Sequence, residues 1–130
     1  MKSLTFLLLV VIALIVSDNS RTDTNTTDKV VQSSWSIADS KSFARDKLNE
    51  WKDTQVSCLN RLWGKESAWN PSAFNTNRVM GKHAGGIPQL LGLDPDTPAT
   101  LQIERGLDYI YYRYGTPCDA WAYWKRNGNY

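Results

Sequence analysis

Histidine, cysteine and net charge are all scarce in this sequence, and each scarcity excludes a class of function. The chain has one His, two Cys and a formal net charge of +2. A balance so close to neutral gives no basis for binding nucleic acid. His83 has no companion His, Cys or Asp at metal-ligand spacing, so we expect no metal site and treat it as a loop residue. Phosphate-loop, dinucleotide-binding and Ser-His-Asp motifs are also missing, and no cofactor is expected.

Long apolar runs are equally scarce, since only one occurs, at the N-terminus. Leu4–Val16 is shorter than the roughly 20 residues that a membrane-spanning helix needs, and it is typical of a signal peptide. Residues 1–17 are therefore predicted to be a signal peptide or a short membrane anchor, with possible membrane attachment through residues 4–16. The polar residues 18–34 are predicted to be a flexible linker. Residues 35–130 are enough for one domain with a modest core.

Apolar positions at helical spacing predict an α+β domain that is mostly α. Four segments show the pattern: 39–51, 53–67, 99–115 and 116–130. Asp39 or Ser40 is the expected N-cap of the first segment, and Asp53 or Thr54 that of the second. Thr116 is the expected N-cap of the last, because a proline follows it at the first helical position.

The stretch between the second and third helical segments is predicted to be loop. Residues 75–100 are rich in Gly and Pro, which punctuate regular structure. After this loop, the apolar face of the third helix is expected to carry Leu101, Ile103, Leu107 and Ile110, followed by Tyr111 and Tyr114. Gly115 is a natural stop for that helix.

Glu66 is difficult to explain as an ordinary surface carboxylate. It follows Leu59 and Leu62 at spacings that place all three on one face of the predicted helix. The helix must end soon after Glu66, because Asn70 precedes Pro71 and is pushed out of the helical region. A carboxyl on the last turn of a buried helix can face a cleft, and burial would raise its pKa. The alternative is a structural role, in which Glu66 pairs with a buried Arg or accepts local hydrogen bonds.

The two cysteines are most simply explained as one disulfide. Cys58 and Cys118 would then tie the helix that carries Glu66 to the last helix, in an oxidising compartment. Two buried free thiols are the alternative.

Aromatic residues are abundant, with six Trp and six Tyr. Such side chains serve both cores and stacking on sugar rings. We assign Tyr109, Tyr112 and Trp121 to core packing. Tyr123 and Tyr130 are expected to face a cleft and bind substrate there.

Three blocks of the sequence together resemble one family. The blocks are "CLNRLWGKESAWNPSAFN", "AGGIPQL" and "PATLQIERGLDYIYYRYGTPCDAWAYWKRNGNY". In this order they are similar to the soluble-lytic-transglycosylase-like group of lytic transglycosylases, in its compact form with E-S-x-W-N-P and G-I-P-Q blocks. The resemblance covers residues 56–130 and implies a lysozyme-like fold for the single domain over 35–130, which we expect to be a monomer.

The resemblance implies a peptidoglycan lytic transglycosylase with Glu66 as its catalytic acid/base. Ser67 and Gln89 would hold the N-acetyl groups of the sugar or orient Glu66, and the cleft tyrosine of the family would correspond to Tyr123 or to its neighbour Trp124. The enzyme would cleave the MurNAc–GlcNAc β-1,4 bond of the glycan strands and form 1,6-anhydroMurNAc. Such a protein would be exported, in the periplasm, outside the cell, or anchored to a membrane facing the wall.

Two other functions stay open at this point. A lysozyme-type hydrolase would need a second carboxylate, for which Asp94, Asp96, Asp108 and Asp119 are candidates. A transglycosylase needs only one, because the C6 hydroxyl of the substrate itself attacks C1. The third possibility is a non-catalytic wall-binding module, against which the presence of Glu66 argues.

Overall fold

The computed structural model describes residues 35–130, so the predicted signal peptide or anchor over 1–17 and the predicted linker over 18–34 lie outside the described residues. The elements in chain order are α2 (Ile37–Lys47), α3 (Asp53–Ser67), β1 (Phe74–Val79), β2 (Lys82–Gly85), β3 (Leu90–Leu91), α4 (Ala99–Tyr114) and α5 (Pro117–Asn127). This is an α+β arrangement that is mostly α, as the sequence predicts. Within residues 35–130, no helix has both the length and the apolar character needed to cross a membrane.

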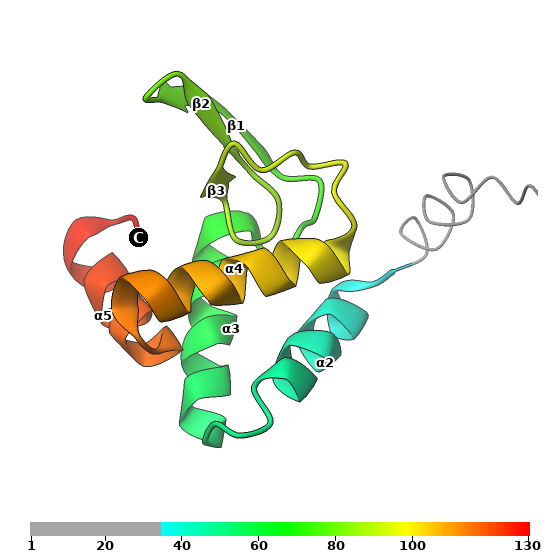
Figure 1. Cartoon of the computed structure of the whole chain (residues 1–130), viewed down its shortest axis with the longest axis vertical. Coiled ribbons are helices and arrows are strands. Elements are labelled where there is room, and N and C mark those ends of the chain that lie inside the picture. The colour runs from blue at the N-terminus through cyan, green and yellow to red at the C-terminus, as the bar shows by residue number, and fades with distance from the viewer. Residues whose placement is uncertain (1–34) are drawn as a thin grey trace, which may run out of the picture.

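The helices pack around a shared core, and the sheet lies at one end of them (Figure 1). α3 packs on α5, and α4 contacts both α2 and α5. The core is made mainly of side chains from α3 and α4, with smaller contributions from α2 and α5, from Trp69 after α3 and from Ile87 in the loop between β2 and β3. Its largest fully buried members include Trp63, Trp69, Leu59, Leu62, Ile87, Ile103 and Ile110.

The first two helices begin at residues other than the predicted caps. Ser36 is the N-cap of α2, and it forms a capping box in which its hydroxyl accepts from Asp39 N at 3.1 Å while Asp39 Oδ2 accepts from Ser36 N at 2.8 Å. Asp39 and Ser40 therefore lie inside the helix, and their assignment as caps was wrong. α3 begins at Asp53 with Lys52 as an N-cap that makes no side-chain bond. At the last helix, Thr116 caps α5 as predicted.

The stretch predicted to be loop contains an antiparallel sheet with strand order β1-β2-β3. Phe74 pairs with Gly85, which also pairs with Leu90. All six residues of β1 are exposed, so its sequence lacks the alternation of apolar and polar residues by which a half-buried strand is recognised. The loop prediction for 75–100 was therefore wrong for the three strands, including β2 with His83, but residues 86–89 and 92–98 are loop as predicted.

The buried face of α4 combines two isoleucines with small and polar residues. Its buried residues are Ala99, Gln102, Ile103, Gly106 and Ile110. Leu101 and Tyr111 are 42% and 63% exposed, and Tyr112 is 86% exposed, so their predicted inward positions were wrong. A Cβ at Gly106 would lie 2.6 Å from the Trp63 ring, which shows how closely α4 approaches α3 at this point. A glycine makes this contact, and hydropathy does not detect it.

The disulfide between Cys58 and Cys118 is present, as predicted, and no free cysteine occurs among the described residues. It joins α3 to the first turn of α5, with the two Cα atoms 5.0 Å apart. The start of α5 is thereby held beside the first half of α3, and Trp124, further along α5, reaches Glu66 on the last turn of α3.

Candidate functional site

Glu66 lies on the last turn of α3 and is partly buried. The helix ends at Ser67, and Ala68 caps it in the left-handed conformation at φ 52°, followed by Trp69 at φ 62°. These two residues turn the chain sharply away from the helix axis. The carboxyl of Glu66 therefore stands at the edge of the core, where the chain leaves it.

Burial raises the pKa of Glu66, and a hydrogen bond from Trp124 partly opposes this effect. Trp124 Nε1 donates to Glu66 Oε1 at 2.6 Å. No Arg or Lys in residues 35–130 lies within ion-pair distance of the carboxyl, so the structural alternative of a buried Arg partner does not apply within this range. Oε2 makes no hydrogen bond to any described residue, which leaves it available to a bound molecule.

Trp124 is the aromatic residue that contacts Glu66, not Tyr123. It reaches α3 from α5, and its ring stacks on Trp121 with 5.3 Å between ring centroids and 17° between planes. Trp121 therefore packs as predicted. The three-residue spacing of the two tryptophans places them on one helix face, and this spacing was the available signal for Trp124.

Tyr130 lies beside Glu66, and its hydroxyl forms two hydrogen bonds within the protein. The hydroxyl accepts from Trp63 Nε1 at 2.9 Å and donates to Pro88 O at 2.7 Å. Burial raises its pKa well above the usual value, and the negative charge of Glu66 adds to the shift. Since the only donor of the hydroxyl is spent on Pro88, Tyr130 holds the loop that contains Pro88 against α3.

Tyr123 lies in a cluster of tyrosines behind this contact. Its ring is 5.2 Å from that of Tyr114, which in turn contacts Tyr109 and Tyr130. The contact with Tyr114 shows that Tyr109 packs as predicted. Burial in this cluster raises the pKa of Tyr114 to about 12. Tyr123 makes no hydrogen bond to Glu66. Within residues 35–130, the hydrogen bond to Glu66 comes from Trp124.

Ser67 and Gln89 both hold the loop between β2 and β3. Ser67 Oγ donates to Ile87 O at 2.6 Å. Gln89, itself at φ 52°, donates through Nε2 to Gly86 O at 3.0 Å and to Ala73 O at 3.3 Å. Both side chains thus donate to backbone carbonyls, and neither makes a hydrogen bond to Glu66. The amide oxygen of Gln89 makes no hydrogen bond to a described residue and can still accept one.

Gln102 is a buried residue that the sequence reasoning missed. Its side chain is fully buried in α4, and Oε1 accepts from Ile87 N at 2.8 Å. Nε2 donates to Pro71 O at 2.9 Å and to Thr97 O at 2.8 Å. One amide therefore joins the chain after α3, the loop after β2 and the loop before α4. A Gln beside the buried Ile103 in a helical pattern was the only sequence signal.

The acidic residues considered as partners of Glu66 lie on the surface. Asp94 and Asp96 are exposed, and Asp94 Oδ1 accepts from Asp96 N at 2.8 Å in a local turn. Asp108 and Asp119 are exposed residues of α4 and α5. Burial and the Trp124 hydrogen bond are the causes of the shifted pKa of Glu66, and no neighbouring carboxylate is among them. Residues 35–130 contain no group of three or more His, Cys, Asp or Glu that could hold a metal ion.

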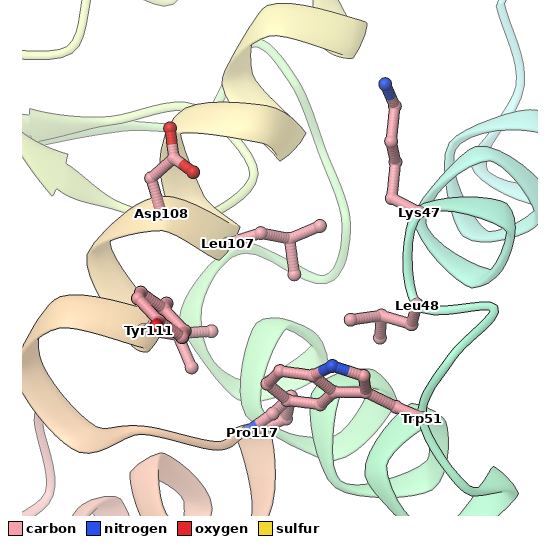
Figure 2. Close-up of a pocket in the computed structure, with 8 residues that line it drawn as sticks. Lys47, Leu48, Trp51, Leu107, Asp108, Tyr111 and Pro117 are labelled. Carbon is pink, nitrogen blue, oxygen red and sulfur yellow. The ribbon is translucent and has the colours of Figure 1, made fainter.

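A separate cavity of about 190 Å³ lies between the end of α2 and the middle of α4 (Figure 2). Leu48, Leu107 and Trp51 point into it, while Lys47 and Asp108 stand at its rim (Figure 2). Lys47 pairs with Glu104 at 2.7 Å. Of the residues considered for the site, only Asp108 lines this cavity, and Glu66, with the substrate-binding residues predicted around it, does not.

Comparison of the chain with family models, with curated proteins and with solved structures finds no match in any of the three. Functional argument therefore depends on the residues and on the geometry of the site.

Proposed function

We propose that this chain is a lytic transglycosylase of the soluble-lytic-transglycosylase-like group, with a lysozyme-like domain and Glu66 as its single acid/base. The observation that supports this proposal most is the setting of Glu66. Its carboxyl is partly buried at a helix end, burial raises its pKa, Trp124 holds one of its oxygens, and the other oxygen is unbonded within the described residues. A carboxyl whose pKa is raised keeps its proton to higher pH than an ordinary Glu, and glycoside cleavage needs such a group as its acid.

The proposed reaction uses one carboxyl group twice, first as an acid and then as a base. Glu66 protonates the glycosidic oxygen, which leaves as the hydroxyl of the GlcNAc fragment when its bond to C1 of MurNAc breaks. The C6 hydroxyl oxygen of the same MurNAc then bonds to C1, and its proton passes to the Glu66 carboxylate. The acid is restored, water takes no part, and the product ends in a 1,6-anhydro ring.

The surroundings of Glu66 support one essential carboxylate over two. In a retaining glycosidase the two carboxyl groups stand about 5 Å apart, and each would then affect the pKa of the other. No such contribution reaches Glu66 from the described residues. Asp94 and Asp96, two of the carboxylates that the lysozyme-type alternative offers, lie in an exposed turn and are not among the causes of the raised pKa of Glu66.

The disulfide supports an exported location. A bond between Cys58 and Cys118 suggests an oxidising compartment, which is where peptidoglycan lies. The finer assignment to periplasm, extracellular space or an anchored form is part of the proposal.

Product analysis tests the function directly. Purified peptidoglycan digested with the full chain should yield fragments with anhydro ends, lighter by one water than hydrolysis products, by mass spectrometry. An Asp94→Asn/Asp96→Asn double variant should keep most of this activity. Reducing ends as the main product, with activity lost in the double variant, would assign the protein to the lysozyme-type hydrolases. Tight wall binding without any cleavage would instead indicate a non-catalytic module.

A further inference from the structure

The tip of the β1–β2 hairpin displays a large apolar side chain where the backbone disfavours one. Val79 pairs with Lys82, so Met80 and Gly81 form a two-residue turn, and both have positive φ, 51° and 77°. Turns with two positive φ values favour Asn followed by Gly. The left-handed region is unfavourable for a long side chain such as Met80. Met80 is nevertheless present there and is 91% exposed.

No packing contact within the described residues offsets the backbone strain at Met80. Its neighbour Val79 is 54% exposed, and the two side chains form what we call the hairpin tip. The hairpin projects away from the helices (Figure 1). Strain that packing does not compensate is an indication of function, and the two adjacent apolar side chains are exposed where they can meet another surface.

Two cations stand on either side of the hairpin tip. Arg78 pairs across the hairpin with His83, whose ring Nε2 accepts from Arg78 Nε at 2.9 Å. This bond leaves the other guanidinium N–H groups of Arg78 without a described partner, and neither Arg78 nor Lys82 forms an ion pair within residues 35–130. The sequence from Ser67 to Leu93 contains no Asp or Glu. The whole sheet region is therefore positive, with no acidic side chain of its own to neutralise it.

We propose that the hairpin tip docks on an anionic lipid surface. Val79 and Met80 would enter the boundary between headgroups and acyl chains, and Arg78 and Lys82 would lie against the headgroup phosphates. Apolar side chains flanked by Lys and Arg are the combination that binds the interface of anionic bilayers. This contact is additional to the chemistry proposed for Glu66 and does not depend on it.

The shape of the hairpin tip favours lipid over the other possible occupants. A stable protein interface buries about 800 Å² on each partner, and two side chains on a narrow turn offer far less. Glycan recognition uses flat aromatic faces, whereas the hairpin tip carries a thioether and an isopropyl group. A soft headgroup layer is the surface that two projecting apolar side chains can enter without a matching pocket.

A dye at the hairpin tip tests the contact in the full chain. The Met80→Cys variant is labelled with an environment-sensitive fluorophore under non-reducing conditions, and Arg45→Cys, on the exposed face of α2, is the matched control. With vesicles of equal parts phosphatidylglycerol and phosphatidylcholine, the emission of the dye at position 80 should shift to shorter wavelength. The size of this shift should decrease as the salt concentration is raised. The dye at position 45 should not shift, even where another part of the chain holds the protein on the vesicle.

Charge variants test whether the cations beside the hairpin tip contribute to binding anionic lipid. With the dye at position 80, Lys82→Gln should lower the apparent vesicle affinity about fivefold, as expected for one cation near an anionic surface. Arg45→Gln removes the same charge elsewhere and should change the affinity much less. A second variant removes Met80 without disturbing the turn. Here the dye is attached to Val79→Cys, and Met80→Asn supplies a residue that the turn favours. The wavelength shift of this dye should be smaller than that of the same dye at position 79 with Met80 in place.

Three results would overturn the proposal. The first is no shift at position 80 with anionic vesicles, and the second is an equal shift with phosphatidylcholine alone. The third is a shift with isolated peptidoglycan but none with vesicles, which would assign the hairpin tip to glycan. None of these results bears on whether Glu66 cleaves the glycan, so failure of this inference and failure of the proposed function are distinguishable.

Discussion

The helical part of this domain buries large apolar side chains, whereas the first strand of the sheet exposes them. In α3, Leu59, Leu62 and Trp63 are exposed by 1% or less. In β1, every residue is exposed. The rigid, buried part carries Glu66, since its position depends on helices that are packed and joined by a disulfide. The exposed part gains little stability from burial, so its apolar side chains call for an explanation outside the domain.

Loss of the disulfide should affect the helical part more than any other single change. Replacing both Cys58 and Cys118 by Ala removes the link between α3 and α5. The bond closes a loop with a sequence separation of 60 residues, for which chain entropy predicts a destabilisation of about 4 kcal/mol. Urea unfolding followed by tryptophan fluorescence measures the effect. Adding reductant should destabilise the wild type and leave the double variant unchanged, and equal midpoints for the two proteins would contradict the prediction.

Glu66→Gln should separate activity from stability in the same part of the molecule. The amide keeps the size of Glu66 and can accept from Trp124, but it has no transferable acidic proton. Activity on peptidoglycan should fall by a factor on the order of 10² or more, as for loss of a general acid. Zymography of the folded variant checks this, and near-normal activity would leave only the structural role for Glu66.

The same variant gives a pH test whose sign is fixed by the raised pKa of Glu66. Below the unfolded-state value of 4.5 the carboxyl is protonated in both states and contributes no difference. As the pH rises above 4.5, the unfolded state loses its proton first, so wild-type stability falls until the folded-state pKa is passed. The Gln variant lacks this loss and should be the more stable protein at neutral pH. Urea midpoints at acidic and neutral pH measure the difference, and a less stable variant at neutral pH would show that the carboxylate is well accommodated.

Local sequence patterns predicted the helical part because its signals lie within a few residues of one another. The Thr116 cap of α5, the stop at Gly115 and the place of Glu66 on the core face of α3 all follow from such patterns. The disulfide followed from having only two cysteines in the sequence. Ser36 and Asp39 also carry a local signal, and only the choice of residue within it was wrong.

The remaining parts could not be predicted because they depend on contacts between distant segments. The bond from Trp124 to Glu66 joins residues 58 positions apart, and Gln102 contacts loops up to 31 positions away. No periodicity encodes such pairs. The sheet was missed for the opposite reason, since its strands bury too little to leave a pattern.

Trp124→Phe should shift the pH dependence of the proposed site while keeping its shape. Phe preserves an aromatic ring against Trp121 but cannot donate to Glu66 Oε1. The Trp124 hydrogen bond lowers the pKa of Glu66, so removing it should raise that pKa further. The basic limb of the rate of wall lysis, where the acid loses its proton, should move to higher pH. Trp121→Phe is the matched control, because it alters the same stack without touching Glu66, and a limb that moves equally in both variants would contradict the role given to Trp124.

Met80→Asn should produce the smallest change, and we expect it to stabilise the domain at any pH. A side chain such as Met loses about 1–2 kcal/mol in the left-handed conformation, and Asn tolerates it far better. With Met80 at φ 51° and Gly81 at φ 77°, the substitution supplies the residue pair that this turn prefers. We expect a gain of about 1 kcal/mol, which corresponds to a rise of about 4–8 °C in Tm for a domain of this size. Calorimetry of the variant beside Met80→Leu, which keeps the strained apolar side chain and should change little, measures the gain. If both variants match the wild type, the turn carries no strain, and the contrast between a stabilised helical part and a strained hairpin would be lost.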